Sequence, residues 1–215
     1  MVRAPAVLSQ RLNALTLVAL SALVLTASAV AATQARVTRV KVPRADLTLS
    51  LPSSWRRVDA TTARSIAQQG LAKENPQLSS LLAELDRPGT GLVFFAFDPK
   101  GAAKFATNLN IVVSKIPTGV TLGQLRDAAE SELTRIPGRV GKPKTVATRL
   151  PGGPVVASTI DIRITNRGAS VVARVTQYAF LRPGRSVVVS FTTRKSTFPA
   201  YKAAFTAAAR SIRFG

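Results

Sequence analysis

The hydrophobic positions of this chain follow two repeats, one typical of strands and one typical of helices. Residues 46–51 (DLTLSL) alternate apolar and polar side chains, as a half-buried strand does. Residues 91–98 (GLVFFAFD) and 108–116 (NLNIVVSKI) are more continuously apolar, and we predict strands there too. Asp98 followed by Pro99 is a turn signal that closes the first of these two strands.

The second half of the chain predicts further strands joined by tight turns. These strands cover residues 144–150, 155–165, 170–181 and 186–194. The turns between the last three are residues 166–169 (NRGA) and 182–185 (RPGR). If Asn166 pairs with Ala169, then Asp161 lies opposite Arg174, which is a favourable cross-strand charge pair.

Helical spacing of apolar side chains marks four further segments. Thr121 is the predicted N-cap of a helix over residues 122–135, and residues 199–211 form the closing helix. Two earlier helices are predicted over residues 61–69 and from Asn75 and Pro76 onward.

The strands differ from those of a sheet that is buried on one face only. Adjacent positions are apolar in Val171 and Val172 and in residues 187–189 (VVV), which is the pattern of a sheet covered on both faces. Tight hairpin turns make neighbouring strands antiparallel. The predicted fold class is therefore α+β, with a mostly antiparallel central sheet sandwiched between helices.

The first 31 residues have the layout of a secretory signal peptide. Arg3 and Arg11 precede an apolar stretch at residues 14–25, and small residues then lead to a predicted cleavage between Ala31 and Ala32. The alternative is a membrane anchor that stays uncleaved, because about 20 apolar residues can span a bilayer. We therefore predict an exported protein with a signal at residues 1–31, a basic tether at 32–45 and a single domain at 46–215.

Composition excludes several kinds of chemistry. The chain has no Cys and no His, so no disulfide, no His-based zinc site and no Ser-His-Asp triad can form. A hydrolase that uses a pair of carboxylates remains open in principle. The ten acidic residues fall in no recognisable active-site motif, however. We expect no enzyme activity, no cofactor and no metal site.

Charge is the strongest remaining signal. The chain carries 30 basic and 10 acidic residues, for a net charge of +20. Residues 133–215 hold 15 of the basic residues and a single acid, Asp161. This excess indicates either a solvated basic surface or an anionic partner, such as lipid, a wall polymer or an acidic protein. Nucleic acid is not expected, because export removes the chain from it and no basic-aromatic nucleic-acid module is present.

Several segments together resemble a known group of proteins. They are "LTLSLPSSW", "GLVFFAFDP", "ATNLNIVVSKIPTGVTLGQL", "LPGGPVVASTIDI", "VTQYAFLRPGRSVVVSFTTR" and "YKAAFTAAARSIRF". In this layout the chain resembles bacterial exported proteins of the PsbP-like group, including the LpqN-type lipoproteins. The resemblance implies an α/β/α sandwich and a role as a binding or assembly subunit. LpqN-type members usually carry a lipidated Cys, and this chain has none.

A few residues are candidates for a functional role. Trp55 could stack on a ligand or pack on the sheet edge, and Asp98 could act as an acid or base, bind a cation, or cap its turn. Possible contacts to an anionic partner are made by arginines near the ends of the last strands. These arginines are Arg163, Arg174, Arg182, Arg185 and Arg194.

Two functions are compatible with these observations. The first is a non-catalytic binding or assembly module of the cell envelope, which engages an unknown envelope protein or an anionic surface. The second is a carrier that holds a small molecule or lipid in a pocket between sheet and helices. Attachment to the membrane by the chain itself requires that the signal stays uncleaved.

Overall fold

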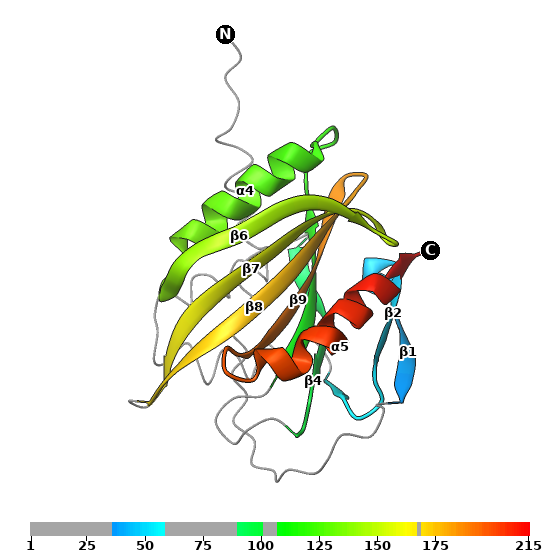
Figure 1. Cartoon of the computed structure of the whole chain (residues 1–215). Coiled ribbons are helices and arrows are strands. Elements are labelled where there is room, and N and C mark those ends of the chain that lie inside the picture. The colour runs from blue at the N-terminus through cyan, green and yellow to red at the C-terminus, as the bar shows by residue number, and fades with distance from the viewer. Residues whose placement is uncertain (1–35, 59–89, 101–106, 167–168) are drawn as a thin grey trace.

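The centre of the fold is a seven-stranded antiparallel sheet (Figure 1). It is seen in a computed structural model that describes residues 36–58, 90–100, 107–166 and 169–215. In spatial order its strands are β3 (Arg56–Val58), β4 (Thr90–Phe97), β5 (Asn108–Lys115), β9 (Arg185–Arg194), β8 (Ala169–Arg182), β7 (Gly153–Asn166) and β6 (Arg139–Leu150). The mostly antiparallel sheet expected from the hairpin turns is thus confirmed.

A second, smaller sheet brings the two ends of the domain together. Its strands are β1 (Val37–Val42), β2 (Leu47–Pro52) and β10 (Arg213–Phe214), with β2 in the middle. A 3-10 turn, η3 (Pro43–Ala45), joins β1 to β2, and Val40 and Val42 are buried. The prediction of a basic tether at residues 32–45 is therefore wrong from residue 37 onward, because these valines pair and pack as a strand does. Residues 32–35 lie outside the described residues.

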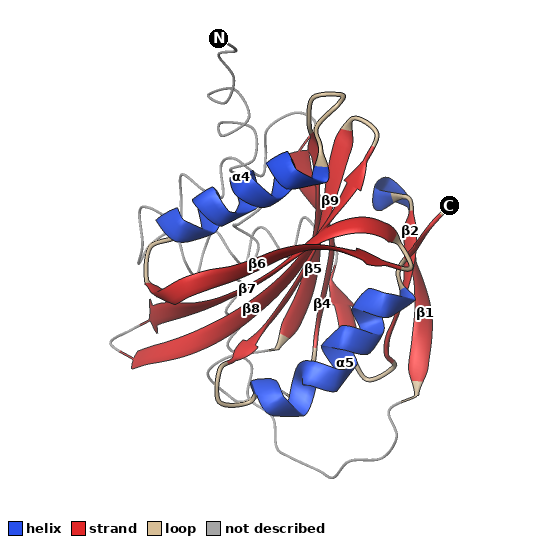
Figure 2. Ribbon diagram, turned by 45° about the horizontal axis from the view of Figure 1, so that its top comes forward, coloured by secondary structure: helices blue, strands red, loops and turns tan. Residues whose placement is uncertain are grey.

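Both faces of the large sheet are covered, which makes the molecule a sandwich (Figure 2). The helix α4 (Leu122–Arg135) lies on one face, where Leu125 and Ala129 pack on Val188. The helix α5 (Phe198–Ser211) and the small sheet lie on the other face. There Val187 and Phe191 of β9 belong to one hydrophobic cluster with buried residues of the small sheet and α5. Neighbouring residues of β9 thus face opposite layers, and the α+β sandwich predicted from adjacent apolar positions is confirmed.

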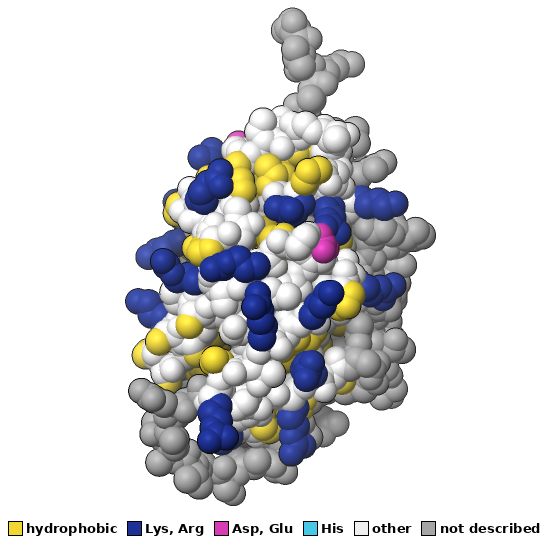
Figure 3. Space-filling model, turned by 90° about the vertical axis from the view of Figure 1, so that its right-hand side faces the viewer, with side chains coloured by type: hydrophobic (Ala, Val, Ile, Leu, Met, Phe, Trp, Pro, Cys, Tyr) yellow, Lys and Arg dark blue, Asp and Glu magenta, His cyan; other side chains and the backbone are white. Residues whose placement is uncertain are grey.

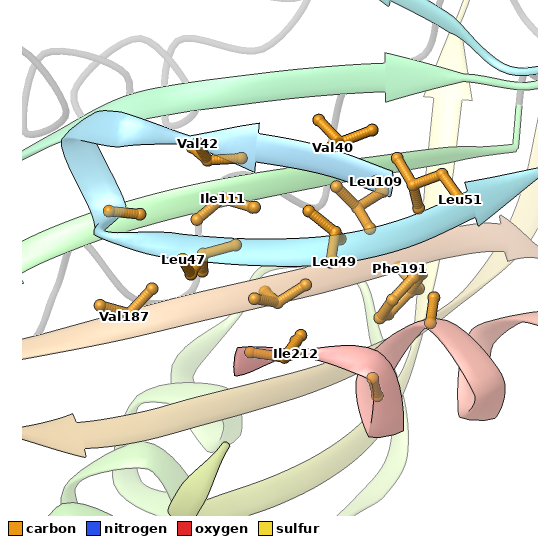
Figure 4. Close-up of a cluster of buried hydrophobic side chains, with 14 of the residues drawn as sticks. Val40, Val42, Leu47, Leu49, Leu51, Leu109, Ile111, Val187, Phe191 and Ile212 are labelled. Carbon is orange, nitrogen blue, oxygen red and sulfur yellow. The ribbon is translucent and has the colours of Figure 1, made fainter. Parts of the chain in front are cut away.

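The larger core lies between the two sheets and α5 (Figure 4). Leu47 and Leu49 of β2 point toward Leu109 and Ile111 of β5, and Ile212 closes the cluster beside α5. Each of these side chains is at most 2% exposed. Burying one such side chain contributes about 1.5–3 kcal/mol, so this core attaches the small sheet firmly to the large one.

Most boundaries agree with the sequence patterns. The turn at residues 182–185 is present, and Thr121 caps α4 in a capping box with Gln124. β6 begins at Arg139 rather than at residue 144, because an irregularity between Val140 and Lys144 lets the strand start earlier. The signal peptide and the predicted helices at residues 61–69 and from residue 75 lie outside the described residues. Within the described ranges, no helix has the length and apolar character needed to cross a membrane.

Candidate functional site

Asp161 is the centre of an ion-paired cluster near the β7–β8 turn. Asn166 pairs with Ala169, which places Asp161 opposite Arg174 as predicted. Arg174 donates to both carboxylate oxygens of Asp161 over 2.7 and 2.9 Å, and Lys195 Nζ lies 3.0 Å from Oδ2. The Arg174 guanidinium also lies 5.0 Å from the ring centroid of Phe198, at the start of α5. The cluster therefore joins β7, β8 and α5.

The protonation of Asp161 follows from this environment. Its side chain is 10% exposed, and burial by itself raises the carboxyl pKa. The hydrogen bonds and charges of Arg174 and Lys195 outweigh burial, so the pKa of Asp161 is lowered. Asp161 is therefore ionised at neutral pH and bound on both oxygens, which suits a structural role better than proton transfer.

Arg182 and Arg185 lie at the opposite end of β8 and β9 and hold the chain ends in place. The Arg182 guanidinium stacks 4.5 Å from the ring centroid of Phe214. Arg185 Nη2 lies 3.3 Å from Asp46 Oδ2, next to the start of β2. These two arginines thus support the pairing of β2 with β10.

The five arginines predicted to contact an anionic partner do not form one surface. Arg185 and Arg194 are the two end residues of the ten-residue strand β9, so nine residue steps separate them by roughly 30 Å. Arg174 is bound to Asp161, whereas Arg163 is exposed on β7. Contact of these arginines with a partner stays a prediction, but they cannot all touch one small anion.

A second polar cluster fixes the start of α5 against the end of β4. Asp98 is 7% exposed, and its Oδ1 accepts the backbone N–H of Lys100 over 2.9 Å, which closes the predicted turn. Its Oδ2 accepts the hydroxyl of Tyr201 over 2.8 Å. Burial first, and the bond to Asp98 second, raise the pKa of Tyr201 to about 12. Both oxygens of Asp98 are engaged, so its role is to cap and to anchor.

Trp55 and Tyr201 pack on the same side chain of α5, Phe205. Trp55 meets Phe205 of α5 edge to face, with ring centroids 6.4 Å apart. Tyr201 stacks on the same Phe205 at 5.7 Å. Trp55 is therefore half-buried against the core, as the packing interpretation expects, but its ring partner lies on α5 and not on the sheet edge.

A row of neutral polar side chains crosses the sheet face that α4 partly covers. Five residues from five adjacent strands stand in register across the sheet: Asn110, Ser190, Gln177, Ser158 and Thr145. Gln177 Nε2 donates to Ser190 Oγ over 3.2 Å, and Ser158 Oγ donates to Thr145 Oγ1 over 3.4 Å. We call these five residues the polar row.

Hydroxyl groups beside the polar row are buried without a partner. Ser114 and Ser186 face each other across β5 and β9, and Thr192 lies further along β9. All three are fully buried, and their hydroxyls make no hydrogen bond to any residue in the described part of the chain. Buried hydroxyls are normally satisfied by protein, water or a ligand.

Sequence reasoning missed the polar row. Asn108 and Asn110 alternate with Leu109 and Ile111, which is also the pattern of a half-exposed strand. The register that brings Asn110 next to Ser190 depends on the pairing of β5 with β9, strands about 80 residues apart in the chain. A local pattern contains no information on such pairing.

Metal binding has no support in the geometry. No group of three or more Asp and Glu side chains gathers within the regions that the structure describes.

The layers and strand order define an α/β/α sandwich, the fold found in LpqN. The structure of LpqN, involved in cell envelope biogenesis of Mycobacterium tuberculosis, is 13% identical, with a TM-score of 0.50 over 84% of this chain and 91% of that one. At this identity the likeness shows the fold alone.

Two further structures are similar at lower scores. Cyanobacterial PsbP from Synechocystis sp. PCC 6803 is 15% identical, with a TM-score of 0.46 over 88% of this chain and 98% of that one. The Saccharomyces cerevisiae Ran-binding protein Mog1p is 12% identical, with a TM-score of 0.47 over 84% and 96%. No protein-family model matches the sequence, and no curated protein matches it significantly.

Proposed function

We propose that this protein is an exported, non-catalytic binding or assembly module of the cell envelope that engages an anionic or protein partner. The observation that carries the proposal is the unbalanced positive charge of a domain whose acids are engaged internally. Outside α4, the acids that the structure describes are Asp46, Asp98 and Asp161. Arg185 pairs with Asp46, and Tyr201 donates a hydrogen bond to Asp98. Arg174 and Lys195 both pair with Asp161.

This arrangement favours binding over catalysis. Hydrolysis by carboxylates needs two acids that face one substrate with their oxygens available. Asp98 and Asp161 each have both oxygens engaged by the protein. The surface is left with an excess of cations, which attract an anionic partner over about a Debye length.

Location in the envelope has two supports. The N-terminal sequence has the layout of an export signal, with its cleavage point between Ala31 and Ala32. LpqN, which shares the fold, is described as involved in cell envelope biogenesis.

Affinity purification from native envelope tests the proposal. Tagged protein is incubated with the envelope fraction at low and at physiological salt, and bound proteins, lipids and polymers are identified. We expect a partner that is retained at low salt and partly lost at physiological salt, because exposed charges are screened. Recovery of nothing above an unrelated basic protein of similar charge would refute the proposal.

The polar row favours a second candidate, a carrier for a small molecule with a polar part. Gln177 lies at the middle of the row, and Ser114, Ser186 and Thr192 supply further hydroxyls. Solvent extraction of the purified protein followed by mass spectrometry would reveal a retained ligand. A carrier loses that ligand in the variant Gln177→Leu but keeps it in Lys142→Gln, which changes an exposed side chain. Extracts without any retained molecule argue against a carrier.

A further inference from the structure

The two outer layers of the sandwich differ in the sign of their charge. On one side α4 carries Asp127, Glu130 and Glu132 against Arg126 and Arg135. On the other side, the small sheet and α5 carry six cations. These six, which we call the cationic layer, are Arg39, Lys41, Arg44, Lys202, Arg210 and Arg213. The acids among the described residues of this side are the exposed Asp46, which Arg185 binds, and the largely covered Asp98 and Asp161, whose carboxylates are bound by Tyr201 and by Arg174 with Lys195.

Figure 3 looks toward the side of the molecule where β1, β2 and the C-terminus lie in Figure 1. Lys and Arg side chains are spread over this face, with few acidic ones among them. The side chains of the cationic layer are all exposed. The molecule is thus electrically polarised across its layers, and an anionic surface would orient it with this face inward.

Three of the cations lie at neighbouring positions on the outer face of the small sheet, around Thr48. The guanidinium of one of them, Arg213, donates to the carbonyl oxygens of Arg210 and Ile212 over 2.8 Å each. Lys41 and Arg213 stand in register with Thr48, one on each side. Strands lie about 4.8 Å apart, so the backbones of these two residues are about 10 Å from each other. Arg39 reaches the same place, with its Nη2 3.5 Å from Thr48 Oγ1. Like charges at such distances repel one another, and nearby anions relieve that repulsion.

The exposed face of α5 extends the cationic layer. Lys202 and Arg210 are two turns apart, roughly 12 Å along the helix, and both are exposed. Between them the exposed positions are Ala203, Thr206 and Ala207, whose small side chains let a flat surface approach closely. The layer therefore presents several long cations around short neutral side chains, rather than a cleft for one anion.

The start of β1 favours a bilayer over a soluble polymer as the anionic surface. Val37 is 68% exposed and lies on the same outer face of β1 as Arg39 and Lys41. An exposed apolar side chain beside cations suits the interface of an anionic membrane.

We infer that the cationic layer is the face by which this protein docks on an anionic phospholipid bilayer. The inference rests on the proposed function and specifies its partner and its contact surface. It also differs from the contact residues predicted from the sequence, because those arginines lie on β7, β8 and β9 and not in the small sheet or α5. Docking leaves α4 and the polar row directed away from the membrane.

The test compares two charge-matched variants of the mature chain in sedimentation with vesicles of neutral lipid containing anionic phosphatidylglycerol. The layer variant is Arg39→Gln, Lys41→Gln and Arg213→Gln. The control variant is Arg135→Gln, Lys142→Gln and Lys144→Gln, which changes three exposed cations of α4 and β6. Each basic residue near an anionic surface strengthens binding about fivefold, so the layer variant should bind on the order of 100-fold more weakly. The control variant should stay within about fivefold of wild type.

The result that overturns the inference is an equal loss of binding in both variants, because net charge rather than this face would then set affinity. A thermal melt followed by Trp55 fluorescence shows whether the layer variant is folded. If it is not, the double variant Lys202→Gln and Arg210→Gln takes its place, with an expected loss on the order of 25-fold.

Two further measurements distinguish docking on a bilayer from binding of a single free anion, and distinguish failure of this inference from failure of the proposed function. Inorganic phosphate at constant ionic strength should leave vesicle binding unchanged; displacement by phosphate would mean a single-anion site and would overturn the docking surface. Docking on the bilayer is refuted if the wild-type protein does not bind the vesicles but does bind an anionic wall polymer or an envelope protein. That outcome leaves the proposed function intact.

Discussion

Removal of the Tyr201 hydroxyl should destabilise the protein in a way that depends on pH. In the variant Tyr201→Phe the ring keeps its stack on Phe205, but Asp98 loses the hydrogen bond to Oδ2. A hydrogen bond to a charged group contributes about 1.5–3 kcal/mol. Asp98 is 7% exposed, so water replaces the lost donor poorly. We expect the free energy of unfolding at neutral pH to fall by about 2 kcal/mol.

The pH dependence follows from the pKa of Tyr201. Burial and Asp98 raise it to about 12 in the folded protein, against about 10 in the unfolded chain. Above pH 10 the unfolded chain loses this proton while the folded protein keeps it, so the stabilisation falls between about pH 10 and 12. Two pKa units correspond to about 2.7 kcal/mol, and solvent screening of a partly buried phenol reduces this to about 1–2 kcal/mol.

The measurement is urea unfolding of wild type and variant, followed by Trp55 fluorescence, from about pH 8 to about pH 12. The difference in unfolding free energy should be largest at pH 8 and should shrink as pH rises above 10. Subtraction removes the titration of lysines, which is common to both proteins. Tyr178→Phe is the control, because burial raises the pKa of Tyr178 without a carboxylate partner. The reasoning is refuted if Tyr201→Phe does not lower the free energy of unfolding at pH 8, or if the difference from wild type does not change with pH.

Three further variants test other contacts. Asp161→Asn should cost about 2 kcal/mol at pH 7 in urea unfolding, because Arg174 loses its charged partner. The lowered pKa of Asp161 means that this contribution is present above about pH 4 and disappears as pH falls through the folded value, so the difference should shrink in acid. Thr121→Ala should cost about 1 kcal/mol in the same assay through loss of the α4 cap, and an unchanged midpoint would contradict the cap's role. Gly138→Ala should lower the melting temperature more than Gly119→Ala; both have positive φ, but only at Gly138 does the new Cβ meet a backbone oxygen, 2.5 Å away.

The parts of the fold that could be predicted from the sequence are those set by neighbouring residues. The turn at residues 166–169 determined the register of β7 with β8, and with it the pair of Asp161 and Arg174. Apolar side chains at adjacent positions of β9 showed that both sheet faces are covered. Thr121, three residues before Gln124, marked the start of α4.

The parts that could not be predicted depend on contacts between distant segments. Tyr201 and Asp98 are 103 residues apart, and no local pattern links a tyrosine on a helix to a turn acid. β1 was interpreted as a tether because Arg39 and Lys41 dominate its composition, although Val40 and Val42 alternate with them as a strand requires. The arginines that the sequence predicts as anionic contacts lie on β7, β8 and β9, whereas Arg213 reaches the small sheet only when β10 pairs with β2.

The pairing of β2 with β10 has a consequence for how the chain folds as it emerges. Thr48 and Arg213 are partners, so the small sheet cannot be completed until almost the whole domain is available. β5 likewise waits for β9, about 80 residues later. Non-local pairings of this kind slow folding, since long loops must close before their contacts form. A chain that crosses a membrane as an extended polymer benefits from such a delay, because premature folding on the near side would block its passage.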